Sequence, residues 1–222
     1  MFRLIGRFLA GKAVAVVKTT FFNLDDAKRQ RVMDAALEEF GFYGYERGST
    51  DRIIRRSGIS KGGLYEYIES KQDLFVYLVQ EAYNSLYAYI QKQLDESGKP
   101  SRGGDLLDLV NHASRAALDF YLEHPPVVRL IASLASLTDP DVRQKVDSLF
   151  TEQFLELFGG ADFSGLRFEP EKVLDLLKWL LIKTRNDYVA AAERFEDRAQ
   201  IEEAYLADWN FILAVLRDGV YF

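Results

Sequence analysis

The chain has 222 residues, of which 48% are hydrophobic and 28% charged, a balance typical of a globular protein with a sizeable core. It contains no cysteine, which excludes disulfides, thiolate nucleophiles and cysteine metal sites. The net charge is −6, but residues 1–24 carry four basic side chains and no acidic one, whereas residues 73–222 carry a net charge of −10. The excess of acidic over basic side chains therefore lies in residues 73–222, outside the N-terminal third of the chain.

Residues 1–20 are apolar and basic, but their longest uncharged run, residues 13–17, is too short for a signal peptide or a membrane span. We expect an additional helix or tail ahead of the first domain. An arm that lies on DNA phosphates or on a membrane surface is the alternative. Because the apolar runs in residues 1–18 are short and interrupted by charges, we expect this segment to be dispensable for folding, so that its deletion leaves the melting temperature nearly unchanged.

The first domain helix is predicted from about Asp25 to Tyr43, with Asn23 as its N-cap. Asp25 and Asp26 in its first turn suit the helix dipole. Its buried stripe is predicted to comprise Met33, Ala36, Leu37 and Phe40.

Two short helices and a tight turn follow, over residues 49–69. Ser49 and Ser60 are candidate N-caps, and Gly58 stands where a helix ends with a left-handed residue. On a helical wheel, Leu64 and Ile68 point inward. The outer face then holds Gly62, Gly63, Glu66 and Tyr67, with Lys61 and Tyr65 on its flank. Two glycines on an exposed helical face are unfavourable for stability, so their presence indicates that another molecule approaches the backbone closely.

The segment from about residue 21 to residue 75 resembles the DNA-binding domain of TetR-type bacterial transcriptional regulators. The matching positions are 35–40, 44–45, 57–62, 64–65, 67–68 and 70–75, together with Ser49 and Ile53. Two positions depart from the family pattern: Ile54 stands where Ala is usual, and Gly63 where Thr is frequent. The loss of a hydroxyl at Gly63 puts a phosphate contact there in doubt.

The resemblance implies roles for individual residues. Lys61, Gly62 and Tyr65 match positions that meet base edges, whereas Gly63, Tyr67, Lys71 and Thr50 match positions at the DNA backbone. The local cluster of basic side chains adds Arg52 as a candidate phosphate contact. The alternatives are a solvated face for the arginines and core packing for the tyrosines. The predicted DNA-binding set is Thr50, Arg52, Lys61, Gly62, Gly63, Tyr65, Tyr67 and Lys71.

A long helix, capped by Ser70, is predicted from Lys71 to about Glu96. Further helices are expected at about 105–124, 127–137, 140–158, 170–195 and 199–218, with no convincing strand. The predicted fold is all-α: an N-terminal three-helix helix-turn-helix domain that a long helix joins to a C-terminal helical ligand and dimerisation domain. The expected divisions are an extension at 1–20, the DNA-binding domain at 21–70 and the regulatory domain at 71–222.

The resemblance also implies a homodimer formed by the last two helices and a pocket for a small-molecule effector. Apolar residues on those helices make the candidate dimer interface: Leu177, Leu181, Leu206, Trp209, Leu213 and Leu216. Large side chains with hydrogen-bonding ends are the candidate ligand contacts: Tyr121, Arg129, Trp179, Arg185 and Tyr188. The alternative is that each of these residues belongs to ordinary core or surface.

The predicted function is that of a cytoplasmic TetR-like repressor, which binds a near-palindromic operator as a homodimer and is released by a small molecule. No cofactor and no metal are expected, and no motif of a nucleophile, a phosphate-binding loop or a metal site supports an enzyme. A membrane-associated or structural helical protein without DNA binding is the alternative, although no stable membrane insertion is expected.

Overall fold

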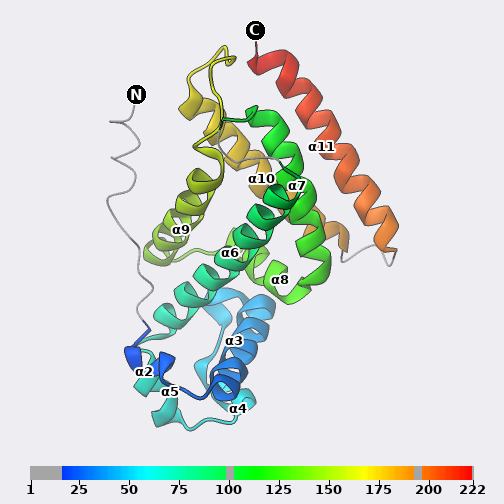
Figure 1. The fold of residues 1–222 in the computed structure, drawn as a ribbon. Coiled ribbons are helices and arrows are strands. Elements are labelled where there is room, and N and C mark those ends of the chain that lie inside the picture. The colour runs from blue at the N-terminus through cyan, green and yellow to red at the C-terminus, as the bar shows by residue number, and fades with distance from the viewer. Residues whose placement is uncertain (1–16, 99–102, 193–196, 222) are drawn as a thin grey trace. The chain divides into compact units, whose positions relative to one another are not determined.

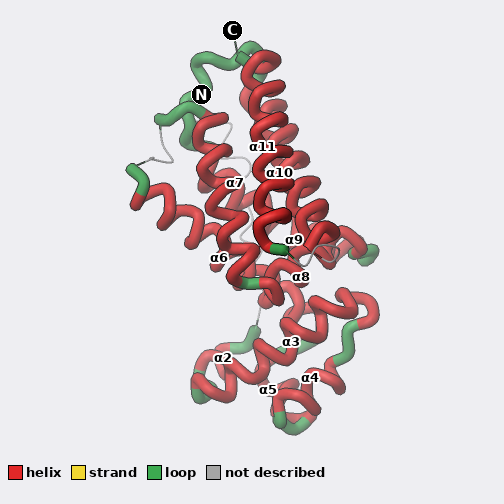
Figure 2. The backbone as a smooth tube through the Cα atoms, turned by 90° about the vertical axis from the view of Figure 1, so that its right-hand side faces the viewer, coloured by secondary structure: helices red, strands yellow, loops and turns green. Residues whose placement is uncertain are grey.

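The computed structural model describes residues 17–98, 103–192 and 197–221. Helices make up nearly all of the described chain, and no β-strand occurs in it (Figure 2). Two isolated backbone bridges, Asp105 with Asp162 and Leu166 with Tyr221, are the exceptions among the described residues. The all-α class predicted from the sequence is confirmed.

The order of helices also follows the prediction (Figure 1). The elements are α2 Thr19–Phe22, α3 Asp26–Arg47, α4 Thr50–Ser57, α5 Lys61–Tyr67, α6 Lys71–Glu96, α7 Leu106–Glu123, α8 Pro125–Ser133, the 3₁₀ turn η1 Leu134–Ser136, α9 Pro140–Phe158, α10 Pro170–Ala192 and α11 Arg198–Val220. The predicted Asn23 cap of α3 is wrong, because the side chain of Asp25 accepts the hydrogen bond from Lys28 N–H.

The chain divides into two compact units. Among the described residues, those of 17–84 and 129–152 form unit 1, and those of 85–128 and 153–221 form unit 2. The chain crosses between the units within α6, α8 and α9. Residues 129–152 thus group with the helix-turn-helix segment rather than with the C-terminal helices.

The core of unit 1 forms where α3, α4, α5 and the start of α6 converge. Ile53, Leu64 and Ile68 are fully buried, as the helical wheel predicted. The rings of Phe40 and Phe75 meet edge to face with their centroids 5.1 Å apart, an arrangement that adds to the stabilisation from buried area. This core holds the two short helices at a fixed angle.

The end of α3 depends on two glycines. Gly44 interrupts the helix with φ +68°, a conformation that L side chains rarely adopt. Gly48 has an ordinary φ, but a Cβ atom there would stand 2.5 Å from Cδ1 of the Phe40 ring. The chain can therefore turn into α4 against the buried Phe40 ring only without a side chain at position 48.

The last turns of α3 also contact the segment after α8. The Glu46 carboxylate accepts hydrogen bonds from the Thr138 N–H and hydroxyl, at 2.6 and 2.8 Å. Desolvation raises the pKa of this carboxyl, but the hydrogen bonds outweigh it and hold the pKa below its ordinary value. The Arg129 guanidinium lies 4.7 Å from the centre of the Phe42 ring. These contacts explain why residues 129–152 belong to unit 1.

Residues 17–21 pack on the end of α5. Val17 is buried, the Lys18 N–H donates to the Tyr67 carbonyl at 2.8 Å, and Phe21 is fully buried. Residues 1–16 lie outside the described part of the chain. Val17 and Lys18 thus contact the domain, although the sequence assigned them to an extension. The expectation that residues 1–18 are dispensable for folding stays a prediction.

Unit 2 is built around α7, α10 and α11. Trp209 and Leu177 are fully buried at its centre. At the end of α11, the Arg217 guanidinium donates to the carboxylates of Asp105 and Asp108, at 3.2 and 2.6 Å. Arg217 thereby fastens α11 to the first turn of α7. No helix in the described part of the chain is long and apolar enough to cross a membrane.

Candidate nucleic-acid interface

The turn between α4 and α5 has the geometry predicted from the sequence. Ser49 caps α4 by accepting from Arg52 N–H, and Ser60 caps α5 by accepting from Gly63 N–H. Gly58 ends α4 with φ +70°, in the left-handed region. Local side chains and one glycine therefore determine this turn, which orients α5 across the other helices of the domain.

The outer face of α5 is open. Lys61, Gly62, Tyr65 and Glu66 are exposed, while Leu64 is fully buried beneath them. A Cβ atom at Gly62 would have no heavy atom within 4 Å. The backbone of this helix can therefore be approached closely at that position.

Two polar pairs link this face to the first turn of α4. The hydroxyl groups of Tyr65 and Thr50 are 3.3 Å apart, and Lys61 Nζ lies 3.2 Å from the Asp51 carboxylate. Both pairs are exposed, so each contributes little to stability and exchanges readily for other partners. The pairs bring Thr50, Lys61 and Tyr65, all predicted DNA contacts, to one surface.

Arg52, another predicted contact, is engaged within the domain. Its Nε donates to both oxygens of the fully buried Glu39 carboxylate, at 2.8 and 3.0 Å, and its Nη2 donates to the Arg47 carbonyl. Burial alone raises the pKa of the Glu39 carboxyl, but hydrogen bonds from Arg52 and from Ser49 N–H hold it below its ordinary value. Arg52 therefore fastens α4 to α3.

Tyr67 was predicted to lie on the outer face of α5, and the structure corrects this position. The side chain is only 8% exposed, because residues 17–21 cover the last turn of the helix. Its ring centroid lies 6.3 Å from that of Phe21, and its hydroxyl accepts from Lys28 Nζ at 3.4 Å. The helical wheel could not show this segment, which lies some fifty residues earlier in the chain.

Lys71 also has partners within the domain. Its Nζ donates to the carbonyls of Tyr45, Glu46 and Gly48, at 2.9, 3.4 and 3.4 Å, and lies 4.4 Å from the centre of the Tyr45 ring. Carbonyls at a helix end lack intrahelical donors, so a cation there is stabilising. Lys71 is thus a cap for the end of α3.

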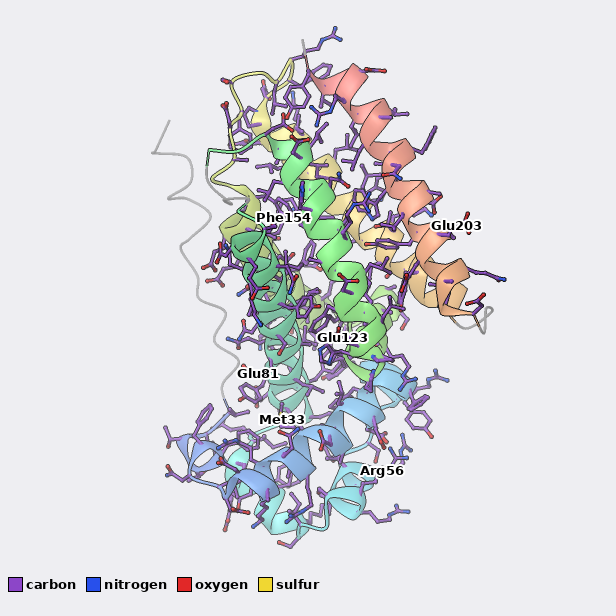
Figure 3. The ribbon with its side chains drawn as sticks, turned by 45° about the vertical axis from the view of Figure 1, so that its right-hand side comes forward. Met33, Arg56, Glu81, Glu123, Phe154 and Glu203 are labelled. Carbon is purple, nitrogen blue, oxygen red and sulfur yellow. The ribbon has the colours of Figure 1, made fainter. Side chains whose placement is uncertain are left out.

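Other basic groups near this surface were not singled out as contacts from the sequence. Arg55 is exposed, and Arg56, labelled on α4 in Figure 3, pairs with Glu38 at 2.7 Å. Lys18 Nζ donates to the Tyr65 carbonyl at 3.1 Å. The excess of basic residues around α4 could have indicated Arg55 and Arg56 as candidate DNA contacts, but nothing in the sequence places Lys18 beside α5.

The predicted ligand residues divide into two groups. Tyr121, Arg185 and Tyr188 are all buried in unit 2, and the two tyrosine rings are 5.3 Å apart. Arg129 belongs to unit 1, on the Phe42 ring, and Trp179 is 60% exposed. Only the first three of the five residues are therefore brought together.

The predicted dimer residues also differ in exposure. Leu177 and Trp209 lie in the core of their own unit, so these two cannot face a second copy in this structure. Leu181, Leu206, Leu213 and Leu216 are half-buried. The exposed apolar side chains on the same two helices are others, namely Leu176, Trp179, Phe211 and Val215.

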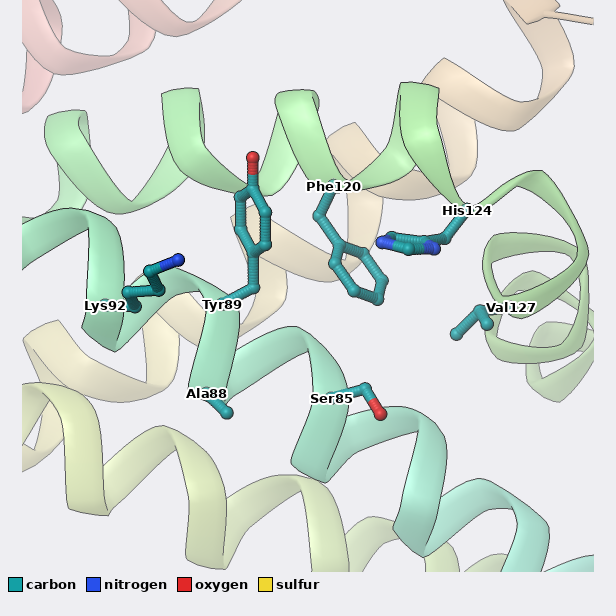
Figure 4. Close-up of a pocket in the computed structure, with 7 residues that line it drawn as sticks. All are labelled: Ser85, Ala88, Tyr89, Lys92, Phe120, His124 and Val127. Atoms are coloured by element: carbon teal, nitrogen blue, oxygen red, sulfur yellow. The ribbon is translucent and has the colours of Figure 1, made fainter.

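A groove with a volume of about 390 Å³ lies in unit 2 (Figure 4). It is lined by Ser85, Ala88, Tyr89, Lys92, Phe120, His124 and Val127. The Phe120 ring lies between those of Tyr89 and His124, with centroids 5.6 and 4.4 Å away. No predicted ligand residue lines this groove. No group of three His, Asp or Glu side chains that could hold a metal occurs among the described residues.

The model of the family described as "Bacterial regulatory proteins, tetR family" matches residues 32–78. An uncharacterised HTH-type transcriptional regulator, YhgD of Bacillus subtilis, is 23% identical over 54% of this chain and 61% of its own length. The HTH-type transcriptional activator FasR of Mycolicibacterium smegmatis is 28% identical over 54% of this chain and 52% of its own. The chain thus spans less than two thirds of the length of these relatives.

Solved structures show the same fold over most of the chain. A TetR family transcriptional regulator from Chloroflexus aurantiacus has a TM-score of 0.63 and 20% identity, covering 93% of this chain and 99% of its own. The regulator FadR from Bacillus subtilis, solved with stearoyl-CoA, has a TM-score of 0.62 and 14% identity, covering 81% and 96%. The likeness therefore extends beyond the helix-turn-helix to the C-terminal helices.

Proposed function

We propose that this chain, whose residues 32–78 match the TetR family model, is a cytoplasmic transcription regulator of that family and binds operator DNA through α5. The observation that carries the proposal is the open outer face of α5, where Gly62 leaves the backbone bare between Lys61 and Tyr65. A major groove about 12 Å wide admits one helix, and a bare backbone lets that helix lie deep in it.

The structure supports different roles for the predicted DNA contacts. Lys61, Gly62 and Tyr65 are exposed on α5 and are the proposed contacts to base edges. Thr50, whose hydroxyl lies 3.3 Å from that of Tyr65, is a proposed backbone contact, as is the exposed Arg55. The peptide N–H of Gly63 is already used by the Ser60 cap, so Gly63 offers only its lack of a side chain.

Three of the predicted contacts have a supporting role instead. Arg52 holds Glu39, Tyr67 packs under residues 17–21, and Lys71 holds the end of α3. Each already has protein partners, and breaking those interactions would oppose any gain from a phosphate contact. We propose that these residues position α4 and α5 rather than read DNA.

The regulator acts as a homodimer in this proposal. Trp179 on α10 and Phe211 on α11 are 60% and 70% exposed, and soluble monomers rarely leave large apolar groups gathered at the surface. Obligate dimers bury more than about 2,000 Å² in total, which two long helices from each copy can supply. A two-fold axis between the copies would match a near-palindromic operator. In this proposal the bound dimer represses its target genes, and a small-molecule effector releases it from the operator.

The dimer is tested by sedimentation of the double variant Trp179→Glu/Phe211→Glu. We expect this variant to be a folded monomer that has lost tight operator binding, because each copy then reaches only one half-site. The matched control is Phe168→Glu, which changes an equally exposed aromatic residue, 55% exposed, outside α10 and α11. Wild-type protein that sediments as a monomer at micromolar concentration and still binds its operator tightly would contradict the dimer.

The DNA proposal is tested by selecting binding sites from random DNA and then footprinting the selected sequence. We expect an inverted repeat and an affinity that falls steeply with salt. If the dimer neutralises about six phosphates, the affinity drops by about a thousandfold between 50 and 200 mM salt. A footprint without inverted symmetry, or an affinity independent of salt, would exclude this function.

A further inference from the structure

Arg185 in unit 2 has a buried N–H group without a hydrogen-bond partner. Arg185 on α10 is only 6% exposed, and its Nε has no hydrogen-bond acceptor. No ion pair to its guanidinium occurs within the described part of the chain. A buried N–H donor without an acceptor costs free energy, so this group requires an explanation.

The surroundings of Arg185 are aromatic. Tyr205 on α11 is buried, and this burial, together with Tyr121, raises the pKa of its hydroxyl well above the ordinary value. A hydrogen bond with Trp209 and the nearby guanidinium of Arg185 lower that pKa by less. The rings of Tyr121, Tyr188 and Tyr205 lie 5.3 to 6.5 Å from one another. None of the groups that act most strongly on Tyr205 is a carboxylate.

Asn186, the next residue on α10, also has a buried polar atom without a partner. The Oδ1 of Asn186 is buried and makes no hydrogen bond. Buried polar groups in folded proteins are nearly always satisfied, and a group of unsatisfied ones indicates a missing ligand, ion or water. The unsatisfied donor here is the Nε–H group of Arg185, which requires an acceptor.

We propose that Arg185, together with the rings of Tyr121, Tyr188 and Tyr205, binds the carboxylate of an organic monoanion with an apolar, planar body. A carboxylate matches the planar guanidinium, and one negative charge balances the single cation of the cluster, whereas a phosphate dianion would leave a buried charge. The tyrosine rings supply flat apolar surface for the rest of the molecule. A ligand that reaches the guanidinium must shift side chains of this cluster, which uses part of its binding free energy.

This inference rests on the proposed regulator function, since it names the chemical class of the effector. Benzoate is the probe, and benzamide is the matched neutral molecule of the same shape. We expect benzoate to bind wild-type protein about 10–100-fold more tightly than benzamide, by calorimetry, because only benzoate offers a charged acceptor. At a hundred times its Kd, benzoate should raise the Tm by about 5–10 °C. Phenyl phosphate should bind more weakly than benzoate.

Arg185→Met keeps the length of the side chain and removes its charge. We expect the preference for benzoate over benzamide to disappear, while the Tm of the ligand-free protein stays the same or rises, because an uncompensated buried charge is removed. The matched control is Arg115→Met, an exposed arginine on α7 that donates to Asn210, which should keep the preference.

Three results would overturn the proposal. The first is equal binding of benzoate and benzamide by the wild type, and the second is tighter binding of phenyl phosphate than of benzoate. The third is loss of the dimer in Arg185→Met, because that result would identify a carboxylate of the second copy as the partner of Arg185. Binding of benzoate is measured without DNA. A protein that binds benzoate but no operator would therefore refute the regulator function and leave the anion site standing.

Discussion

Replacing Gly62 by alanine should make the protein more stable and worse at binding DNA. Gly62 is the second residue of α5, and a Cβ atom there would have nothing within 4 Å, so the methyl group fits without strain. Alanine is favoured over glycine in helices by up to about 1 kcal/mol. For a chain of this size, that gain would raise the Tm by about 2–4 °C.

The same methyl group would project from the face that is proposed to enter the major groove. An extra methyl group in a closely packed contact typically costs about 1–3 kcal/mol. That cost corresponds to a loss of operator affinity of about 5- to 150-fold for each half-site. Stability and affinity should thus change in opposite directions, which a general folding defect cannot produce.

Thermal denaturation and fluorescence anisotropy with a labelled operator measure the two effects. The matched control is Gly219→Ala on α11, where a Cβ atom also has nothing within 4 Å. This control should leave operator affinity unchanged. If Gly62→Ala binds the operator as tightly as the wild type, the outer face of α5 is not the face that lies against DNA.

Further substitutions separate the reading residues from the supporting ones. Tyr65→Phe should weaken operator binding by about 0.5–1.5 kcal/mol with little change in Tm, whereas Tyr67→Phe should leave binding unchanged in the same anisotropy assay. Lys71→Met should lower the free energy of unfolding by about 1–3 kcal/mol in urea titrations, since three carbonyls lose their donor; an unchanged value would refute its capping role. Gly48→Ala should cost a similar amount through its clash with Phe40, and a Tm equal to that of the wild type would contradict this. Glu39→Gln should destabilise at neutral pH. Because the folded-state pKa of Glu39 lies below its ordinary value, the carboxylate stabilises the fold above that value and loses this effect as the pH falls through the folded pKa, so the two stability curves should converge in acid.

The sequence predicted the helices because their ends depend on local chemistry. Ser49, Ser60 and Gly58 act within a few residues of their own position, so a short window contains the whole signal. The same holds for Pro140 and Pro170, each of which begins a helix. Fold class and helix order therefore followed from the sequence.

The roles of individual side chains depend on distant neighbours, which no window contains. Lys71 meets the end of α3 more than twenty residues earlier, and Tyr67 meets residues 17–21. A helical wheel likewise identifies which side of a helix is apolar. It does not show which of those apolar residues face the core of the same unit and which remain exposed. Trp209 and Phe211, two residues apart on α11, are 1% and 70% exposed. The predicted dimer residues therefore included Leu177 and Trp209, which the unit's own core buries, and left out the exposed Phe211.

The ammonium group of Lys71 joins two stretches that are separate in the chain. It belongs to the first turn of α6 and holds the carbonyls that end α3. If either the end of α3 or the start of α6 unfolds, the hydrogen bonds from Lys71 to the three carbonyls break. Both helix ends should therefore open together, as one cooperative unit of local unfolding. Amide hydrogens near residues 45–50 and 71–75 should then exchange with solvent at matching rates, faster than the buried middle of α3 and slower than its first turn. Lys71, which the family resemblance assigns to a DNA contact, would thus control the rate of local unfolding in this domain.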